Sequence, residues 1–516
     1  MGTPKPNMPE VNLKKRQNFF DFFLNKIEKY GNKLPDIVTI FLLLTAFILI
    51  ASSIAGALGW SAKDPVTEDT IAAVNLLNAE GIVMILTEMV NNFMAFPPLG
   101  MVLVAMIGVG FAESTGLIST LMKKTVLASP QFLILPIIVF LGIVGNAAAD
   151  AAFVVLPPIA AMIYMSIGRH PIAGLVVVYA AVATGFSANV IINVLDVAMA
   201  GFTQSAAEIV DPSISLNPAM NYFFTFAATF ILIPVTVFVS RKIVEPRLGS
   251  YRGTYKEDIS EVTKTEIKGL HWASWTFATL IIILLFLTIP ENGLLRNPET
   301  GSLTTDSALM NGIIPLILLL FFLPSLAYGI KTKVIKSDKD IAEHLSKTLS
   351  GLSYYILLSF VAAQMIAYFS WSNLGPIIAI KGSDFLQKIG LTGLPLLVSF
   401  ILFAALINLL IASATAKWAI LAPVFVPMLM YLGYSPATTQ MAYRIGDSIT
   451  NAVTPMLAYF AILLMFARKY DENIKLGTLI STILPFTIFF AFAWIILFSI
   501  WYLLGIPWGP GFPIHL

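Results

Sequence analysis

Six ionisable residues lie inside apolar stretches of this sequence, at depths where a membrane would surround them. They are Glu113, Asp150, Asp196, Lys417, Arg444 and Asp447. A charge at the centre of a bilayer costs a few kcal/mol or more, so each needs a partner or a water-filled cavity. A carboxylate there can carry a proton or help to hold a cation. These charges predict a pathway for ions or polar solutes, although Glu113, near the end of a span, is expected to be structural.

Two long apolar segments, 171–202 and 437–468, are interrupted by polar residues close to these charges. The first interruption reads TGFSANVIINVLD and the second reads RIGDSITNAVTP. Pro455 cannot donate a backbone hydrogen bond, and it disfavours helix at the residue before it. An unwound turn would expose carbonyl oxygens suited to a cation and helix N-termini suited to an anion.

Several of the polar residues in these segments also have a purely structural explanation, whereas Asp196 has no charged neighbour within a helical turn, which favours a functional role. Ser413 and Thr415 could serve helix packing, as small polar residues often do in membranes. Arg444 and Asp447 lie three positions apart on one helix face and could neutralise each other. Lys417 could extend from a hairpin tip to water. The clustering of these residues, more than any one of them, favours a functional site.

The composition places the chain among proteins that cross a membrane many times. Of its 516 residues 57% are hydrophobic and 12% are charged, and the mean hydropathy is +0.84. The net charge of +2 argues against a nucleic-acid partner. The absence of cysteine excludes disulfides and thiolate metal sites. The polar N-terminus lacks the apolar core of a signal peptide.

Nine stretches are long and apolar enough for a crossing, which needs about 20 residues. They are 35–58, 97–118, 171–202, 218–240, 272–290, 309–329, 351–371, 437–468 and 476–505. Two further apolar regions, 131–168 and 394–432, are too long for one span and are split by GNAAAD and SATAK. The arm 133–145 would be only about 20 Å long. The sequence predicts an all-α polytopic membrane protein with about nine transmembrane helices plus two re-entrant helical hairpins.

The two predicted hairpins look like copies of one sequence. NAAADAAFVVLPPIAAMIYMSIGRHP and IASATAKWAILAPVFVPMLMYLGYSP lie 265 positions apart and match at eight of 25 pairs, with Phe153 opposite Trp418. About two matches are expected by chance in such a composition. Broken hydrophobic segments at matching places in two halves are the best sequence indication of a transporter's binding site.

The distribution of basic residues predicts the orientation. If each hairpin returns to its own side, most of the 31 Lys and Arg residues lie on one side, which the positive-inside rule makes cytoplasmic. The two hairpins then enter from opposite sides, as an inverted repeat. The predicted order is a cytoplasmic N-terminal tail (1–34), a first membrane half (35–240), a cytoplasmic linker loop (241–271), a second membrane half (272–505) and an external C-terminal tail (506–516).

These segments resemble the AbgT family, the p-aminobenzoyl-glutamate transporters of bacteria. The resemblance covers almost the whole length and rests most specifically on SATAKWAILAPVF and YRIGDSITNAVTP. It implies a homodimer in the inner membrane, with the hairpins and the substrate in an outer core. It also implies either uptake of p-aminobenzoyl-glutamate or export of p-aminobenzoate-like antimetabolites, including sulfonamides. The family's functional positions fall on Asp196, Thr415, Trp418, Arg444, Asp447 and Pro455 of this sequence.

We therefore expect a secondary transporter of aromatic carboxylates or sulfonamides that is driven by an ion gradient. Arg444 would pair with the substrate's carboxylate and Trp418 would stack on its ring. The remaining expected substrate contacts are Thr415, Ser413, Asn189 and Pro455. Ion or proton coupling is expected at Asp196, Asp447, Asp150 and Asn451, and the candidate Na⁺ ligands are Asp447, Asn451 and Asn146. H⁺ and Na⁺ both stay open as coupling ions, and no organic cofactor is expected.

Three other functions compete with this expectation. A Na⁺-coupled dicarboxylate carrier belongs to the wider ion-transporter superfamily that the chain resembles, but both hairpin tips lack that group's Ser-Asn-Thr motif. An ion channel would also use re-entrant loops, yet channels rarely place Trp, Arg and Asp at one tip. An intramembrane hydrolase could use Asp196 and Asp447 as a dyad. No G-x-x-x-x-G-K-[ST] loop occurs, so no ATP hydrolysis is expected.

Overall fold

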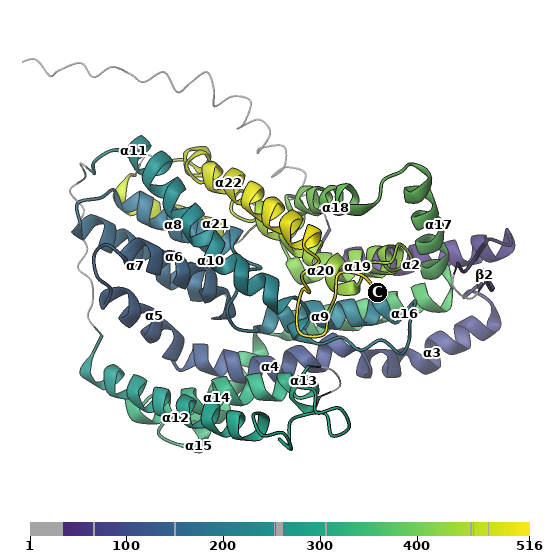
Figure 1. Cartoon of the computed structure of the whole chain (residues 1–516), viewed down its shortest axis with the longest axis horizontal. Helices are drawn as coiled ribbons and strands as arrows, with labels where there is room; N and C mark the ends of the chain where they lie inside the picture. Colours follow the sequence, from purple (N-terminus) through teal and green to yellow (C-terminus); the bar gives the residue numbers. More distant parts are fainter. Residues whose placement is uncertain are drawn as a thin grey trace, which may run out of the picture.

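The fold is a bundle of helices with one small β-ribbon, as the computed structural model shows (Figure 1). The structure describes residues 35–65, 68–148, 151–251, 253, 262–304, 307–454, 457, 459–472 and 474–516. Within these residues, seven helical segments are long and apolar enough to cross a membrane. The helical membrane architecture predicted from the sequence is confirmed.

The seven long segments overlap seven of the nine predicted spans, although the segment Ala79–Ser114 begins well before the predicted span 97–118. They contain α2 (Ile37–Ala57), α3 and α4 (Ala79–Met94 and Pro97–Ser114), α10 (Tyr222–Val239), α12 (Lys264–Thr288), α14 (Ile313–Thr332), α16 (Ser353–Trp371) and α22 (Leu476–Leu503). The other two predicted spans are each divided into two shorter helices. These are α8 (Pro171–Thr184) with α9 (Val194–Ala207), and α20 (Pro436–Thr450) with α21 (Tyr459–Tyr470).

The two predicted hairpins are pairs of short apolar helices. The first consists of α6 (Ile134–Val144), the 3₁₀ turn η1 (Gly145–Ala148) and α7 (Ala151–Ser166), and the second of α18 (Gly393–Asn408) and α19 (Ala414–Met430). At 1.5 Å per residue, the 11 residues of α6 extend only about 17 Å. This length is too small for a complete crossing, which agrees with a re-entrant arm.

The local sequence explains where the helices after each hairpin begin. Pro171 and Pro436 occupy the first helical position, where a missing N–H costs nothing, and His170 and Ser435 cap the two helices from the preceding position. A capping box opens α9, because Asn193 accepts from the amide of Asp196 and Asp196 accepts from the amide of Asn193. Asp196 is thus fixed at the end of the unwound stretch.

Several peripheral elements lie between the predicted spans or at their edges. They are β1 (Ser61–Lys63) and β2 (Thr70–Ala72), which pair antiparallel, α5 (Leu117–Leu127), η2 (Pro218–Asn221), the π turn η3 (Ser240–Val244), α11 (Glu245–Leu248), α13 (Ala308–Asn311), α15 (Asp338–Ser350) and α17 (Leu374–Lys388). Helix α12 begins inside the loop predicted over 241–271, because Thr263 and Glu266 form a capping box there. The tail 1–34 lies outside the described residues.

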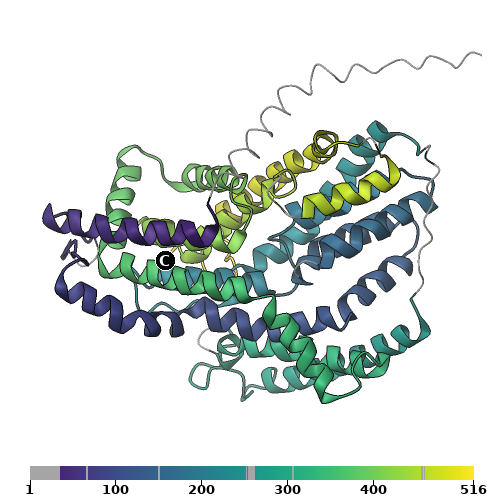
Figure 2. The same cartoon turned by 180° about the vertical axis from the view of Figure 1, so that it is seen from behind.

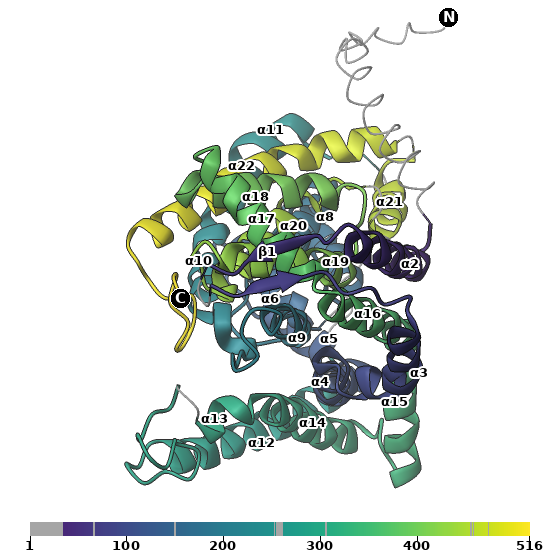
Figure 3. The same ribbon diagram turned by 90° about the vertical axis from the view of Figure 1, so that its right-hand side faces the viewer.

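Helix α4 lies between two groups of helices. It packs against α14 and α15 on one side and against α9 on the other, so that α12, α14 and α15 form a layer along one edge (Figures 1 and 3). Seen from behind, α2 and α3 flank α16 at the opposite end (Figure 2). Helix α9 also contacts α19, so the broken helix of the first half meets the hairpin of the second half.

Residues 506–516, predicted as an external tail, pack against the turn between α19 and α20. Trp508 is fully buried, and its Nε1 donates to Oγ1 of Thr438 at 2.6 Å. The amide of Leu516 donates to the carbonyl of Gly433 at 3.1 Å. The last residues therefore hold the end of the second hairpin in place.

Candidate functional site

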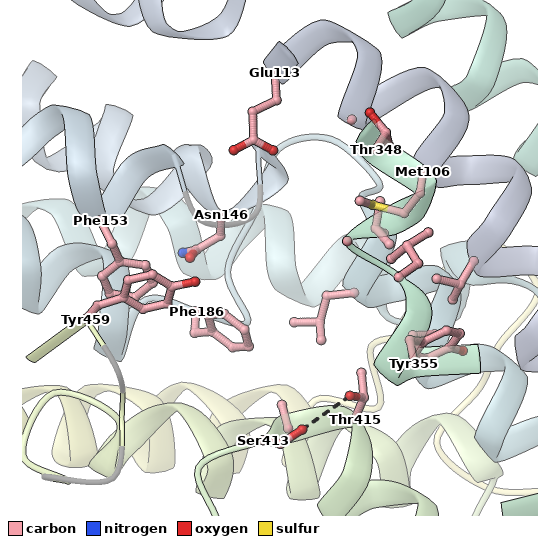
Figure 4. Close-up of a pocket in the computed structure, with 18 of the residues that line it drawn as sticks. Met106, Glu113, Asn146, Phe153, Phe186, Thr348, Tyr355, Ser413, Thr415 and Tyr459 are labelled. Carbon is pink, nitrogen blue, oxygen red and sulfur yellow. Dashed lines mark hydrogen bonds between the residues drawn. The ribbon is translucent and has the colours of Figure 1, made fainter. Parts of the chain in front are cut away.

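A cavity of about 850 Å³ lies between the tips of the two hairpins. The first hairpin contributes Asn146 and Phe153, and the second contributes Ser413 and Thr415. These side chains face one another across the open space (Figure 4). The two copies of the sequence repeat therefore lie on either side of one cavity, which has polar groups from both halves.

One part of the cavity wall combines aromatic rings with an amide. Tyr459 stacks on Phe153 with 4.4 Å between ring centroids and an interplanar angle of 5°, and both rings line the cavity (Figure 4). Phe186, in the unwound stretch after α8, and Asn451, at the end of α20, complete this wall. Offset-stacked rings of this kind present an apolar surface that suits another aromatic group.

At its other end the cavity reaches charged and polar residues of α4 and α15. Glu113 and Ser114 come from the end of α4, and Lys347 and Thr348 come from α15. Glu113, which the sequence suggested to be structural, thus contributes to the cavity wall (Figure 4). Glu113 lies near the end of α4, so it comes from neither hairpin.

Arg444 forms an ion pair with Asp196 inside the protein. Nη1 of Arg444 lies 2.6 Å from Oδ1 of Asp196, and the side chains are 1% and 7% exposed. The carbonyl of Arg444 accepts from Oγ of Ser187 at 3.1 Å, so α20 is also joined to the unwound stretch of the first half. Within the described part of the chain, Nε of Arg444 has no hydrogen-bond partner. Neither charged residue lines the cavity.

A second buried ion pair joins Lys417 to Asp447. Nζ of Lys417 lies 2.6 Å from Oδ1 of Asp447 and also donates to the side-chain oxygen of Asn408. The side chains of Lys417 and Asp447 are 1% and 2% exposed. Lys417 therefore does not extend to water, and Asp447 pairs with Lys417 instead of with Arg444 on its own helix.

Trp418 is fully buried and belongs to a chain of polar contacts. It stacks on Tyr443 with 4.3 Å between centroids. Its Nε1 donates to Oγ1 of Thr203 at 2.9 Å, and Thr203 donates to Gln440 at 2.6 Å. The indole therefore lies behind the cavity wall, where it joins α19 to α9 and α20.

Three asparagines of the first half, Asn146, Asn189 and Asn193, each have a buried side-chain atom without a hydrogen-bond partner among the described residues. Asn146 donates from Nδ2 to the carbonyls of Ile143 and Val182, while its Oδ1 has no partner among the described residues. Asn189 accepts with Oδ1 from the amide of Val190, and its Nδ2 likewise lacks a partner within that part of the chain. Asn146 lines the cavity, whereas Asn189 is buried away from it.

The predicted site residues thus fall into two groups. Those that line the cavity are Asn146, Ser413, Thr415 and Asn451, and those buried behind it are Asn189, Asp196, Trp418, Arg444 and Asp447. Asp150 and Pro455 lie outside the described residues. The sequence interpretation missed Asn408, Thr203, Gln440 and Tyr459. It also did not assign Phe153 to the site, although the repeat aligns that residue with Trp418.

A model of the AbgT transporter family matches residues 22–516. The chain belongs to the AbgT family. It is 36% identical over 485 residues to the p-aminobenzoyl-glutamate transport protein of Escherichia coli K12, which covers 94% of this chain and 95% of that protein. The family resemblance noted in the sequence is confirmed, and membership of a transporter family makes this protein a transporter and not an enzyme.

Two solved transporter structures share the fold of this AbgT-family member. YdaH of Alcanivorax borkumensis, described as having an unusual topology, superposes with a TM-score of 0.89 at 37% identity, covering 92% of this chain and 100% of that one. MtrF of Neisseria gonorrhoeae, assigned to a class of antimetabolite efflux pumps, gives a TM-score of 0.89 at 43% identity over 95% and 100%. The all-α polytopic fold is therefore shared with known transporters.

Proposed function

We propose that this AbgT-family transporter moves p-aminobenzoyl-glutamate, or p-aminobenzoate-like aromatic carboxylates and sulfonamides, across the bacterial inner membrane. The cavity between the hairpin tips carries this proposal. Its volume of about 850 Å³ falls within the usual range for small-molecule sites, about 300–1,000 Å³. Aromatic rings on one wall and hydroxyl and amide groups on the others suit a substrate with a benzene ring and polar ends.

The lining residues suggest how such a substrate is held. Phe153 and Tyr459 would contact its ring, and the hydroxyls of Ser413 and Thr415 would bind its polar groups. Oδ1 of Asn146 has no hydrogen-bond partner among the described residues, so it could accept from an aromatic amine or bind a cation. Trp418 would act indirectly, because it positions α19 against α9.

Arg444 is the group best suited to the substrate's carboxylate, but Asp196 now occupies it. A guanidinium can bind a carboxylate through two parallel hydrogen bonds, and Nε of Arg444 has no partner among the described residues. We propose that the substrate carboxylate replaces Asp196 when the hairpins move. Asp196 would then take up a proton or interact with Na⁺, which would couple the substrate to an ion gradient.

The proposed orientation places the N-terminus in the cytoplasm and the C-terminus outside. The cavity reaches Lys347 on α15, in the lysine-rich segment that the positive-inside rule assigns to the cytoplasm. The described conformation would then be open to the cytoplasm. A homodimer is proposed from the family resemblance alone.

Counterflow in proteoliposomes tests this function. Labelled p-aminobenzoyl-glutamate and p-aminobenzoate would be exchanged against a panel of aromatic carboxylates, dicarboxylates and sulfonamides, in Na⁺ and choline buffers at two pH values. We expect exchange with aromatic carboxylates, and acceleration by a gradient of one of the two ions. Exchange restricted to dicarboxylates, or no exchange by protein that is correctly folded, would contradict the proposal.

Arg444→Gln sharpens the test. It should abolish exchange of carboxylated substrates while a neutral sulfonamide is affected less, because only the former needs the guanidinium. Equal losses for the two substrates would show that Arg444 has a structural role. Arg296, which binds backbone carbonyls of the loop after α12, provides a matched Arg→Gln control outside the cavity.

A further inference from the structure

The ammonium group of Lys417 is enclosed by oxygen atoms at the second hairpin tip. Nζ lies 2.6 Å from Oδ1 of Asp447 and 3.3 Å from the carbonyl oxygen of Ile411, and it donates to Oδ1 of Asn408. The side chain is 1% exposed. A carboxylate, an amide oxygen and a carbonyl from non-helical backbone therefore surround one positive charge.

This set of ligands is the kind that binds a hard metal cation. Such cations take carboxylate, amide and backbone carbonyl oxygens, and transporters bind Na⁺ where unwound helix ends leave carbonyls free. Ile411 lies in the non-helical stretch between α18 and α19, three residues after Asn408, which ends α18. That end of a helix carries a partial negative charge, which also favours a cation.

Asn408 shows that this arrangement of oxygens is fixed by its surroundings. Its Nδ2 donates to the carbonyl of Asp447 at 2.6 Å, to Oγ1 of Thr450 at 3.0 Å and to Oδ1 of Asn451 at 2.8 Å. These bonds leave Oδ1 of Asn408 directed at the ammonium group. The orientation of the amide oxygen is therefore set by α20 and does not depend on Lys417 alone.

The first half of the repeat provides an internal comparison. Ala152 aligns with Lys417, so the first hairpin has no cation at this position. There, Oδ1 of the cavity-lining Asn146 lacks a partner among the described residues. The two tips therefore differ: the second carries its own positive charge, and the first has alanine at the matching position and a buried asparagine oxygen without a partner among the described residues.

We propose that Lys417 is a tethered cation that occupies a Na⁺ site in the second half of the transporter. While Lys417 is present, Asp447 and Asn408 do not bind Na⁺. Removing the ammonium group leaves the three oxygens in place and creates a site for Na⁺ from solution. This inference refines the proposed ion coupling, but it concerns binding and is tested without any transport measurement.

The test compares thermal unfolding of purified wild type, Lys417→Ala and Lys417→Gln in NaCl and in choline chloride at equal ionic strength. For the wild type, we expect any difference in unfolding midpoint between NaCl and choline chloride to be the same with and without Asp447→Asn. Each variant should be stabilised by Na⁺ in a saturable manner, by about 2 °C or more. KCl at the same concentration should have a smaller effect. Adding Asp447→Asn to either variant should remove the response.

Several results would overturn the proposal. One is a pair of folded variants with the same midpoint in Na⁺ and in choline. Another is a wild-type Na⁺ response that disappears in Asp447→Asn. If the variants do not fold in choline, Na⁺ during extraction should restore a monodisperse protein, and failure in both salts counts against the idea. Loss of transport activity plays no part in these outcomes, so they are independent of the proposed substrate.

Discussion

Nη1 of Arg444 and Oδ1 of Asp196, which lie 2.6 Å apart, join the two halves of the chain through a buried ion pair. Arg444 belongs to α20 of the second half, and Asp196 is fixed by the capping box that opens α9 of the first. A movement of one broken helix relative to the other must therefore break or carry along this pair. The pair is well placed to couple substrate binding to a conformational change.

We expect Asp196→Asn to impair both stability and coupling. Arg444 would keep its charge without a counter-charge, and breaking a buried pair in this way typically costs about 3–5 kcal/mol. Gradient-driven flux of p-aminobenzoyl-glutamate in proteoliposomes should fall by at least about tenfold, and the unfolding midpoint should decrease. Asp384→Asn, on the exposed face of α17, is the matched control. Unchanged gradient-driven flux in Asp196→Asn would exclude a coupling role.

Trp418→Phe should lower stability more than substrate affinity. The indole is fully buried, and the change removes its hydrogen bond to Thr203 while the stack on Tyr443 is retained. We expect a loss of about 1–3 kcal/mol with a KM within about twofold of wild type, measured by thermal unfolding and initial uptake rates. A large rise in KM with unchanged unfolding would instead place the indole against the substrate.

Phe153→Leu should lower substrate affinity more than stability. Phe153 lines the cavity and stacks on Tyr459, so its ring is available to an aromatic substrate. Loss of one aromatic contact costs about 0.5–1.5 kcal/mol, which corresponds to roughly two- to tenfold weaker binding. Scintillation proximity binding of labelled p-aminobenzoate measures it, with Phe238→Leu as the control on an exposed face of α10. Equal affinities in the two variants would remove Phe153 from the site.

Thr415→Val removes one hydroxyl from the cavity and keeps the shape of the side chain. If this hydroxyl binds the substrate, the dissociation constant should rise about three- to tenfold, the usual cost of one lost hydrogen bond. Ser399→Ala is a suitable comparison, because that exposed hydroxyl donates only to its own helix, to the carbonyl of Pro395. A stronger effect of Ser399→Ala than of Thr415→Val would contradict the assignment.

Trp508→Ala tests whether the C-terminal segment is a structural part of the bundle. The side chain is fully buried, stacks on Phe498 and donates to Thr438. Truncation of a buried Trp costs about 3–5 kcal/mol, so the unfolding midpoint should decrease clearly. Leu516→Ala, at an exposed side chain of the same segment, should change it little.

The sequence was sufficient to predict the spans and hairpins, because bilayer thickness sets the length of each apolar segment. It did not determine which charges pair. Arg444 and Asp447 lie three positions apart on α20, yet one is directed to α9 and the other to α18 and α19. That choice depends on which helices pack against each side of α20, and the spacing along one helix contains no such information.

The elements between residues 59 and 96 were missed for a related reason. The strands β1 and β2 have three residues each, and α3, with 16 residues, lies wholly outside the nearest predicted span, 97–118, and is shorter than the length that a crossing needs. Cavity residues were found where they interrupted an apolar pattern, as in Ser413 and Thr415. Asn408 was missed because it is a single polar residue at the end of an apolar arm, and only its contacts with α20 reveal its importance.

The pairing of the buried charges also has an electrical consequence. Among the described residues, the buried charged side chains are two anions and two cations, Asp196, Asp447, Lys417 and Arg444, and they cancel. Each net charge moved across the membrane would experience about 2.3 kcal/mol per 100 mV. A rearrangement that carries all four together transfers no charge of its own. The membrane potential would then act only on the charges of the substrate and its coupling ion. The charge moved per transport cycle, measured as current, would equal the sum of those two charges.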